Sequence, residues 1–288
     1  MDNSVVQSTI ICSPYYMMKK ISQLIEERFG IKTELGAEMN NEGTVAAILS
    51  RRTQRKYQEK PIDDEHLEVL LACAQSAPSK SDLQQYSIIV VKDPDAREVI
   101  GGWEGKAPVF LVFCADMRRN QRIAGWRGHG YKNNNIDSFI NATIDSALSM
   151  QNLILAAESI GLGCCPISAI RDRMNTICEL LELPNGVYPI CGLCIGWPLS
   201  EGYVSLRLPP TTVIHQDRYK DTNLADEIED YDQRRHERHA IPPEKQRHTD
   251  KYGVLEYCSW SENVARQLSL PERPKFKEFL NKHGFDLA

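Results

Sequence analysis

The sequence predicts a mixed fold in which helices pack on a β-sheet. Predicted strands and helices alternate up to about residue 200, a pattern typical of α/β and α+β proteins. Apolar and small side chains reach almost all round residues 136–160, which predicts a long, central and mostly buried helix. The chain has 288 residues, of which 42% are apolar, so it can bury a sizeable core in one or two domains.

The first helices are predicted by apolar spacing and by end signals. Residues 15–35 have the pattern of a short amphipathic helix, and Thr44 is a plausible N-cap for a helix that runs to about Ser50. In residues 65–77 apolar side chains recur at helical spacing, which predicts one buried stripe, and Pro78 ends this helix. The stripe consists of Leu67, Leu70, Leu71 and Ala74.

The remaining elements are predicted in the same way. Gly161 is expected to close the long helix, because a glycine often follows the last helical residue. Residues 217–250 contain an acidic block, a basic block and few apolar residues, which favours an extended arm over a second core. The other expected elements are strand 87–91, helix 94–100, strand 109–115, strand 164–168, helix 172–183, strand 188–198, and terminal helices 259–269 and 273–284.

Composition excludes several classes of protein. Acidic residues outnumber basic ones by 39 to 34, which argues against a broad nucleic-acid-binding face. No apolar run approaches the roughly 20 residues of a membrane-spanning helix, and MDNSVVQSTI lacks the order of a signal peptide. Nine irregularly spaced cysteines fit a reduced chain better than a disulfide framework. We therefore expect a cytoplasmic protein.

A cluster of cations, RRTQRKY, occupies residues 51–57. On an extended backbone Arg51, Thr53 and Arg55 would point to one side and could clamp a phosphate, since arginine offers paired donors and stays charged. On a helical backbone Arg51 and Arg55 would still share a face, but Thr53 would leave it. The alternative is a solvated basic helix end. Spacing alone leaves these interpretations open.

Two further stretches could lie against a ligand. Ser79, Ser81 and Gln84 precede a predicted strand, where they could hydrogen-bond a planar heterocycle or form an ordinary turn. The GLGCCP stretch at residues 161–166 is not a dinucleotide fingerprint, because it follows a helix and precedes a strand, the reverse of the required order. It predicts a tight turn and a strand edge.

The cysteines and histidines are expected to have structural rather than catalytic or metal-binding roles. Cys191 and Cys194 lie three positions apart in a predicted strand, so they face opposite sides and are expected to be core thiols, as are the adjacent Cys164 and Cys165. No metal site and no protein acid, base or nucleophile with a distinguishing local sequence is predicted. Four histidines of the expected arm are taken as solvated: His215, His236, His239 and His248.

Taken in order, these segments resemble the nitroreductase family. The series is RRTQRKY, APSKSDLQ, APVFLVFCAD, GLGCCPIS, ICGLCIGWP and LRLP. It is most similar to the branch of NAD(P)H-dependent flavin reductases and oxygen-insensitive nitroreductases that carries a C-terminal extension. The resemblance runs from about residue 44 to the end and leaves the first 40 or so residues uncovered.

The resemblance implies an α+β fold with a central, mainly antiparallel sheet flanked by helices, and an intertwined homodimer with FMN at each end of its interface. It divides the chain into an N-terminal extension (1–43), an FMN-binding core (44–210), and a C-terminal arm with helices (211–288) for dimerisation and donor binding. It assigns the following residues to the FMN site: Arg51, Arg52, Thr53 and Arg55 on the phosphate and ribityl chain, Ser79, Ser81 and Gln84 near the partner's flavin, Pro166, Ile167 and Ser168 behind the ring, and Arg207 completing the phosphate site.

The implied activity is a flavin-borne oxidoreduction. NADH or NADPH would pass hydride to flavin N5, and a quinone, nitroaromatic or flavin acceptor would then take its place in a ping-pong sequence. The alternative is a non-redox protein that stores or senses FMN on the same scaffold. The sequence departs from the family pattern at Ser205, where a lysine is common, near Trp103, where a segment is shortened, and near Pro242, where the branch carries an arginine linked to NADPH.

Overall fold

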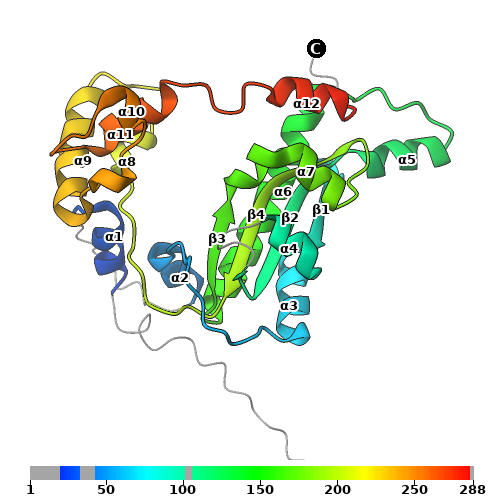
Figure 1. Cartoon of the computed structure of the whole chain (residues 1–288), viewed down its shortest axis with the longest axis horizontal. Helices are drawn as coiled ribbons and strands as arrows, with labels where there is room; N and C mark the ends of the chain where they lie inside the picture. The colour runs from blue at the N-terminus through cyan, green and yellow to red at the C-terminus, as the bar shows by residue number, and fades with distance from the viewer. Residues whose placement is uncertain (1–19, 33–42, 101–105, 286–288) are drawn as a thin grey trace, which may run out of the picture. The chain divides into compact units, whose positions relative to one another are not determined.

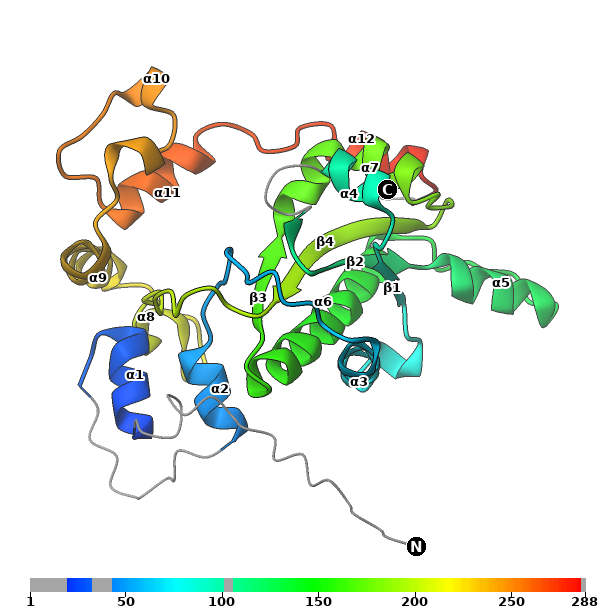
Figure 2. The same cartoon turned by 60° about the horizontal axis from the view of Figure 1, so that its bottom comes forward.

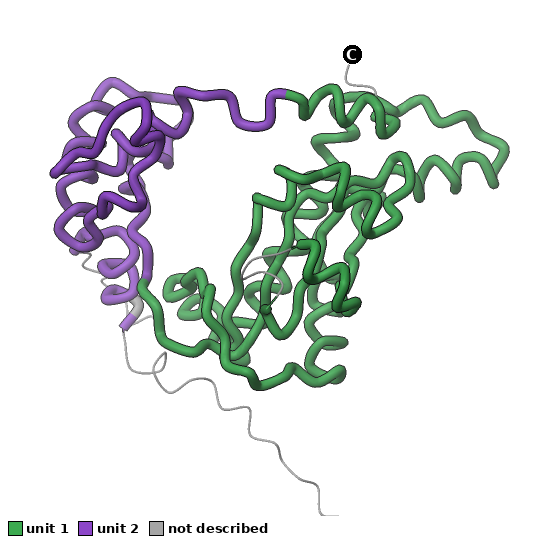
Figure 3. The backbone as a smooth tube through the Cα atoms, in the orientation of Figure 1, with its two compact units in different colours: residues 1–18, 42–203, 275–288 green, residues 19–41, 204–274 purple. Residues whose placement is uncertain are grey.

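The computed structural model describes residues 20–32, 43–100 and 106–285. They form two compact units, which are coloured separately in Figure 3. The described residues of the first unit lie within Glu42–Tyr203 and Lys275–Ala288, and those of the second within Lys19–Asn41 and Val204–Pro274. The expected features near Trp103 lie outside the described residues, as does most of the N-terminal extension.

A four-stranded antiparallel sheet forms the centre of the first unit. The strands are β1 (Tyr86–Val90), β2 (Val109–Asp116), β3 (Gly163–Ile167) and β4 (Val187–Gly196), in the spatial order β1-β2-β4-β3. Every neighbouring pair is antiparallel. The α+β fold with a mainly antiparallel sheet is therefore confirmed, and each strand lies within a few residues of its predicted position.

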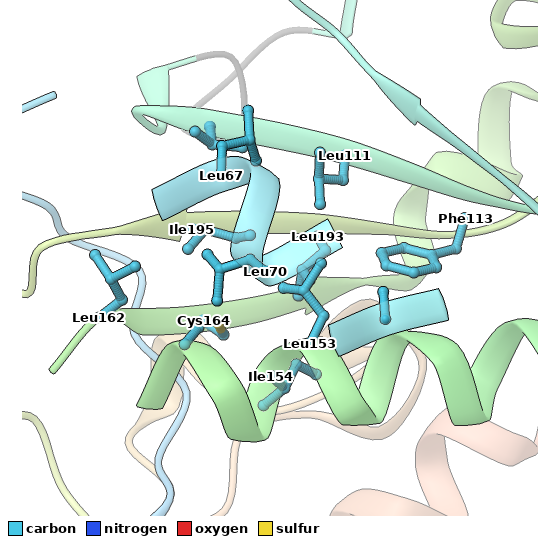
Figure 4. Close-up of a cluster of buried hydrophobic side chains, with 13 residues drawn as sticks. Leu67, Leu70, Leu111, Phe113, Leu153, Ile154, Leu162, Cys164, Leu193 and Ile195 are labelled. Carbon is cyan, nitrogen blue, oxygen red and sulfur yellow. The ribbon is translucent and has the colours of Figure 1, made fainter. Parts of the chain in front are cut away.

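Helices cover both faces of this sheet (Figures 1 and 2). On one face, α3 (Asp64–Gln75) and α6 (Ile136–Ser159) pack against alternate side chains of β2 and β4. Figure 4 shows Leu67 and Leu70 of α3 beside Leu153 and Ile154 of α6, with Leu111 and Leu193 of the sheet. On the other face, α4 (Pro94–Ile100) and α7 (Met174–Leu180) pack on the intervening side chains. The alternation of each strand thus builds two separate apolar clusters.

The long helix α6 is less buried than its composition predicts. It begins at the side-chain cap Asn135 and is followed by Gly161 in the left-handed region, at φ +85°. One face is buried as expected, but a second apolar row is exposed in the single chain. That row consists of Ile136, Ile140, Ile144 and Leu148, which are 47%, 47%, 49% and 39% exposed. A spacing of four residues puts them on one side of the helix.

The remaining helices of the first unit are short. The helix after Gly43 begins at Thr44, so Gly43 and not Thr44 occupies the N-cap position. A terminal helix returns to the core and buries Phe279 and Leu280 near Tyr188 of β4. These helices are α2 (Thr44–Ser50), α5 (Arg118–Trp126) and α12 (Phe276–Lys282), with single 3-10 turns at Lys80–Asp82 and Ser168–Arg173.

The second unit is helical, where an extended arm was expected. The acidic and basic blocks both lie on α9 (Leu224–His239), which buries Tyr231 against Trp260 and anchors Ser261 through Asp232. The four histidines taken as solvated are half-buried. Helix α1 (Ile21–Phe29) is shorter than predicted, because Gly30 ends it in a left-handed turn. The other helices are α8 (Pro210–Val213), α10 (Thr249–Tyr252) and α11 (Trp260–Leu268), with a 3-10 turn at Pro243–Lys245.

Candidate functional site

The cationic segment at residues 51–57 is extended. Helix α2 ends at Ser50, and Arg51 adopts φ −52° and ψ 134°, which turns the chain out of the helix. At the free edge of β3, Thr53 bridges Cys164 in parallel and the Gln54 amide donates to the Cys164 carbonyl at 3.0 Å. Tyr57 then bridges Pro198, which follows β4. The extended alternative is therefore the one that the structure adopts, and the clamp geometry becomes possible.

A glycine permits this close approach. A Cβ at Gly163 would lie 2.4 Å from Cγ of Gln54, well inside van der Waals contact. The hydroxyl of Tyr57 adds a second anchor by donating to the Gln54 carbonyl at 2.6 Å. Burial raises the pKa of Tyr57, so this hydroxyl stays a neutral donor.

The side chains of this segment alternate between two environments. Arg52 and Gln54 are each 7% exposed, and both donate to the carbonyl of Glu201 at 2.9 Å. They line a cavity of about 320 Å³ whose lining does not include Arg51, Thr53 or Arg55. Arg51 and Thr53 are half-buried, and Arg55 is exposed. The alternation of burial therefore separates Arg52 and Gln54 from Arg51, Thr53 and Arg55, and the part that each plays in an FMN site stays a prediction.

The ring-backing residues lie on the same edge of the sheet. Pro166 is the exposed residue of β3, whose other members are buried, and it follows the Cys164 bridge by two positions. Ile167 is buried, and the exposed Ser168 begins a 3-10 turn. Pro166 thus lies on the strand that Thr53 bridges, and Ser168 follows directly after that strand.

The loop before β1 has an unusual backbone. Ser81, Asp82 and Gln84 have φ values of 51°, 56° and 49°, a left-handed conformation that is uncommon outside glycine. Such strain persists only where the surroundings enforce it, and it gathers at functional sites. Ser81 and Gln84 are exposed, whereas Ser79 is half-buried.

Three residues that the sequence did not single out hold this loop. Asp145 of α6 is 1% exposed and accepts hydrogen bonds from the Ser79 hydroxyl and from loop amides. From the other side, Arg119 of α5 donates to the Gln84 carbonyl at 2.8 Å, and Asn120 donates to the Leu83 carbonyl at 3.0 Å. For Asp145, the sequence does contain a signal, because an aspartate interrupts the apolar pattern of residues 136–160.

The predicted site residues of one chain form two separate groups. The clamp residues and Pro166 lie at the β3 edge, while the loop of Ser79, Ser81 and Gln84 leads into β1 at the opposite edge. Three strand spacings, about 14 Å in all, separate the edge strands. The predicted site residues of one chain therefore lie at opposite edges of the sheet.

Arg207 belongs to the second unit. Its amide donates to the Arg28 carbonyl at 2.9 Å, and the Arg28 guanidinium donates back to the Ser205 carbonyl at 3.1 Å. The hydroxyl of Tyr231 donates to the Leu206 carbonyl between them. The LRLP turn is thus rigidly held, and the contribution of Arg207 to a phosphate site stays a prediction.

The cysteines behave as core residues. Cys164 and Cys165 pack in different apolar clusters on opposite faces of the sheet. Cys191 and Cys194 also pack in two different apolar clusters. Each is a free thiol, and burial raises the pKa of Cys164 well above its ordinary value. Within the described ranges, no group of three or more His, Cys, Asp and Glu side chains is placed to hold a metal ion.

This combination of an antiparallel α+β core with an arginine-bearing strand edge has close relatives. The nitroreductase family matches residues 48–197, and the C-terminal domain of that family matches residues 205–288. The chain belongs to the nitroreductase family, as its ordered motifs predict.

Three relatives define the degree of similarity. The FMN reductase [NAD(P)H] of Bacillus subtilis is 34% identical over 84% of this chain and 97% of its own length. The oxygen-insensitive NADPH nitroreductase of Salmonella typhimurium is 32% identical over 84% of this chain and 98% of its own. The solved structure of NfrA2 from B. megaterium superposes with a TM-score of 0.76 at 30% identity, and covers 85% of this chain and 98% of that one.

Proposed function

We propose that this protein is an FMN-dependent oxidoreductase that accepts hydride from NADH or NADPH and reduces a quinone, nitroaromatic or flavin acceptor. The observation that carries the proposal is the extended backbone of residues 51–55 at the edge of β3, on which Arg51, Thr53 and Arg55 alternate with the buried Arg52 and Gln54. The names of the relatives, FMN reductase [NAD(P)H] and oxygen-insensitive NADPH nitroreductase, support the same cofactor and donors.

The donor set fits a flavin mononucleotide. Two guanidinium groups with a hydroxyl between them match the charge and the acceptor oxygens of a phosphate monoester. The backbone behind them is fixed by Cys164 and by the close contact at Gly163, so the clamp is preorganised. Pro166 has no backbone N–H donor and presents its ring at the strand edge, which suits contact with the face of a planar heterocycle.

The reaction assigns limited tasks to the protein. FMN supplies the hydride-accepting chemistry when it is bound. Arg51 and Arg55 would hold the anionic end, Pro166 would back the ring while Ile167 packs in the core behind it, and Ser168 would offer a hydroxyl near the strand end. Donor and acceptor would bind in turn at the same place beside the flavin, which would give alternating half-reactions and would require no acid or base from the chain.

A homodimer follows from the two separate groups of predicted site residues. Arg51, Thr53 and Arg55 of one copy and the loop of Ser79, Ser81 and Gln84 of a second copy together form one FMN site. The exposed row of Ile136, Ile140, Ile144 and Leu148 on α6 supplies an apolar surface for this association. The C-terminal segment 211–288 serves dimerisation and donor binding, with Lys245 and Arg247 following Pro242 in the sequence.

Anaerobic titration tests the function. The purified protein is expected to be yellow, and its flavin absorbance band should bleach on addition of NADH or NADPH, each tested separately. Reoxidation by menadione or nitrofurazone should restore the band. A protein that binds no added FMN would contradict the proposal, and one that binds FMN tightly without reduction by either nucleotide would be a storage or sensor protein instead.

A further inference from the structure

The hydroxyl of Ser79 is already committed within the chain. It donates its proton to Oδ2 of Asp145 at 2.9 Å and accepts the amide of Gln84 at 2.7 Å. A serine hydroxyl has one proton, so in this state Ser79 can offer a ligand only a lone pair. A phosphate or a flavin carbonyl needs a donor, and Ser79 cannot be that donor.

Asp145 gathers the donors of the loop around one carboxylate. Besides Ser79, the amide of Lys80 donates to Oδ1 at 3.0 Å, and the amide of Gln85 donates to Oδ2 at 3.1 Å. These donors come from both ends of the left-handed stretch at Ser81, Asp82 and Gln84. The carboxylate therefore ties the two ends of the loop together.

The left-handed stretch needs such an anchor. Residues that carry a Cβ disfavour this backbone region, and three of them within four positions do not hold it by local preference. Charge-assisted bonds inside a buried site are strong and directional. With both ends fixed, the loop holds Ser81 at an exposed position.

We propose that Asp145 is a positioning residue for the FMN site, that Ser79 acts as its relay, and that Ser81 carries the direct contact to the ligand. The inference rests on the proposed FMN function, and it reassigns Ser79 from a ligand contact to a support of the loop. Asp145 touches neither the ligand nor the reacting atoms, and it acts only through the loop conformation.

The test measures the FMN dissociation constant of single and double variants by fluorescence quenching. Ser81→Ala, Ser79→Ala and Asp145→Asn are each expected to weaken FMN binding by about tenfold. Ser79→Ala in the Asp145→Asn background should add little, because both changes break one network. Ser79→Thr should restore binding, since threonine keeps the hydroxyl. Asp137→Asn, the same change at an exposed position of α6, is the matched control and should bind as the parent does.

Two readouts separate positioning from general stability. Hydrogen exchange should speed up at the amides of Lys80 and Gln85 in Asp145→Asn and Ser79→Ala, while the sheet amides of β2 keep their protection. If Ser79→Ala and Asp145→Asn bind FMN as tightly as the parent, or if their effects are additive, the proposal is overturned. A parent protein that binds no FMN would instead overturn the proposed function, so the two failures are distinguishable.

Discussion

Neighbouring arginines in the cationic segment have different surroundings. Arg52 is buried and bonded to the Glu201 carbonyl, while Arg55 is exposed and Arg51 half-buried on the opposite side. Since the backbone is extended, a shift of one residue changes the face completely. We therefore expect the phosphate contacts to come from the side that carries Arg51 and Arg55, while Arg52 lines the cavity on the other side.

Arg51→Ala and Arg55→Ala are expected to release FMN and to leave the fold intact. Each loses a charge-assisted phosphate contact that contributes about 1.5–3 kcal/mol, so FMN affinity should fall roughly 10- to 100-fold. Fluorescence titration measures the affinity, and thermal unfolding of the FMN-free protein should match that of the parent.

Lys56→Ala is the control for charge, because Lys56 is exposed and outside the predicted clamp. Arg52→Ala is the control for position, and it should lower stability more than it lowers affinity, since it removes a buried donor from the Glu201 carbonyl. A larger loss of FMN affinity in Arg52→Ala than in Arg51→Ala and Arg55→Ala would reverse this assignment.

The thiols offer a check on burial. Cys178 is buried, and burial raises its pKa to about 11, so it remains protonated and unreactive at pH 8. Cys73 is the half-buried member of the eight described thiols. Brief alkylation with iodoacetamide at pH 8, followed by peptide mass spectrometry, should modify Cys73 first among these eight. Early modification of Cys178 would contradict the described packing.

At the scale of elements, the position of the cationic segment depends on β3. The segment has no ladder of its own beyond single bridges at Thr53 and Tyr57, and it is held by close packing over Gly163. Any side chain at that glycine must push Gln54 away. The clamp is therefore sensitive to a position that contacts no ligand.

Gly163→Ala is expected to weaken both stability and FMN binding. The new Cβ would lie 2.4 Å from Gln54 Cγ, so the segment must shift, at a cost of about 1–3 kcal/mol. Differential scanning calorimetry and FMN titration measure the two effects. Gly130→Ala is the matched control, because a Cβ there meets nothing within 4 Å. An unchanged FMN affinity in Gly163→Ala would mean that the segment tolerates displacement.

Strong local patterns allowed most elements to be predicted. The stripe of α3, the apolar run of β2 and the glycine after α6 each depend on side chains close in sequence, and each lies where the pattern placed it. Extended pairing of residues 51–57 with β3 depends on a partner more than a hundred residues away, so spacing alone left it open. The order of the segments carried the family resemblance, and the resemblance implied the fold.

Other features could not be read from local pattern. Helix α9 is poor in apolar residues, and its burial of Tyr231 depends on Trp260 of a later helix. The left-handed loop at Ser81–Gln84 contains no glycine, so no local rule predicts it. It forms because Asp145 and Arg119, distant in sequence, supply its hydrogen bonds.

At the scale of the whole molecule, the single chain leaves an apolar row of α6 exposed. A row of four large aliphatic side chains on one helix is a surface that soluble monomers rarely present and that dimers bury. Within the described residues no helix has the length and apolarity needed to cross a membrane. A second copy of the chain is the partner that the proposed shared FMN site would require.

Ile140→Glu and Ile144→Glu are expected to disrupt the dimer. Each change places a charge in the centre of the apolar row, which strongly opposes burial against a partner. Size-exclusion chromatography with light scattering should show a shift from about 65 kDa, twice the 32.7 kDa chain, toward the monomer. Val69→Glu, at a 57% exposed position of α3, is the control and should leave the dimer intact. A parent chain that is itself monomeric would contradict the shared-site proposal.

If the FMN site is shared between two chains, two variants that each lack a different half of it should complement one another. A chain with Arg51→Ala and Arg55→Ala damages only the β3 half, and a chain with Ser81→Ala damages only the loop half. A mixed dimer of the two variants would contain one site with both defects and one site with neither. Co-expression of two impaired chains should therefore recover tight FMN binding at one site in each mixed dimer, and intersubunit complementation of this kind is impossible for a site built from one chain.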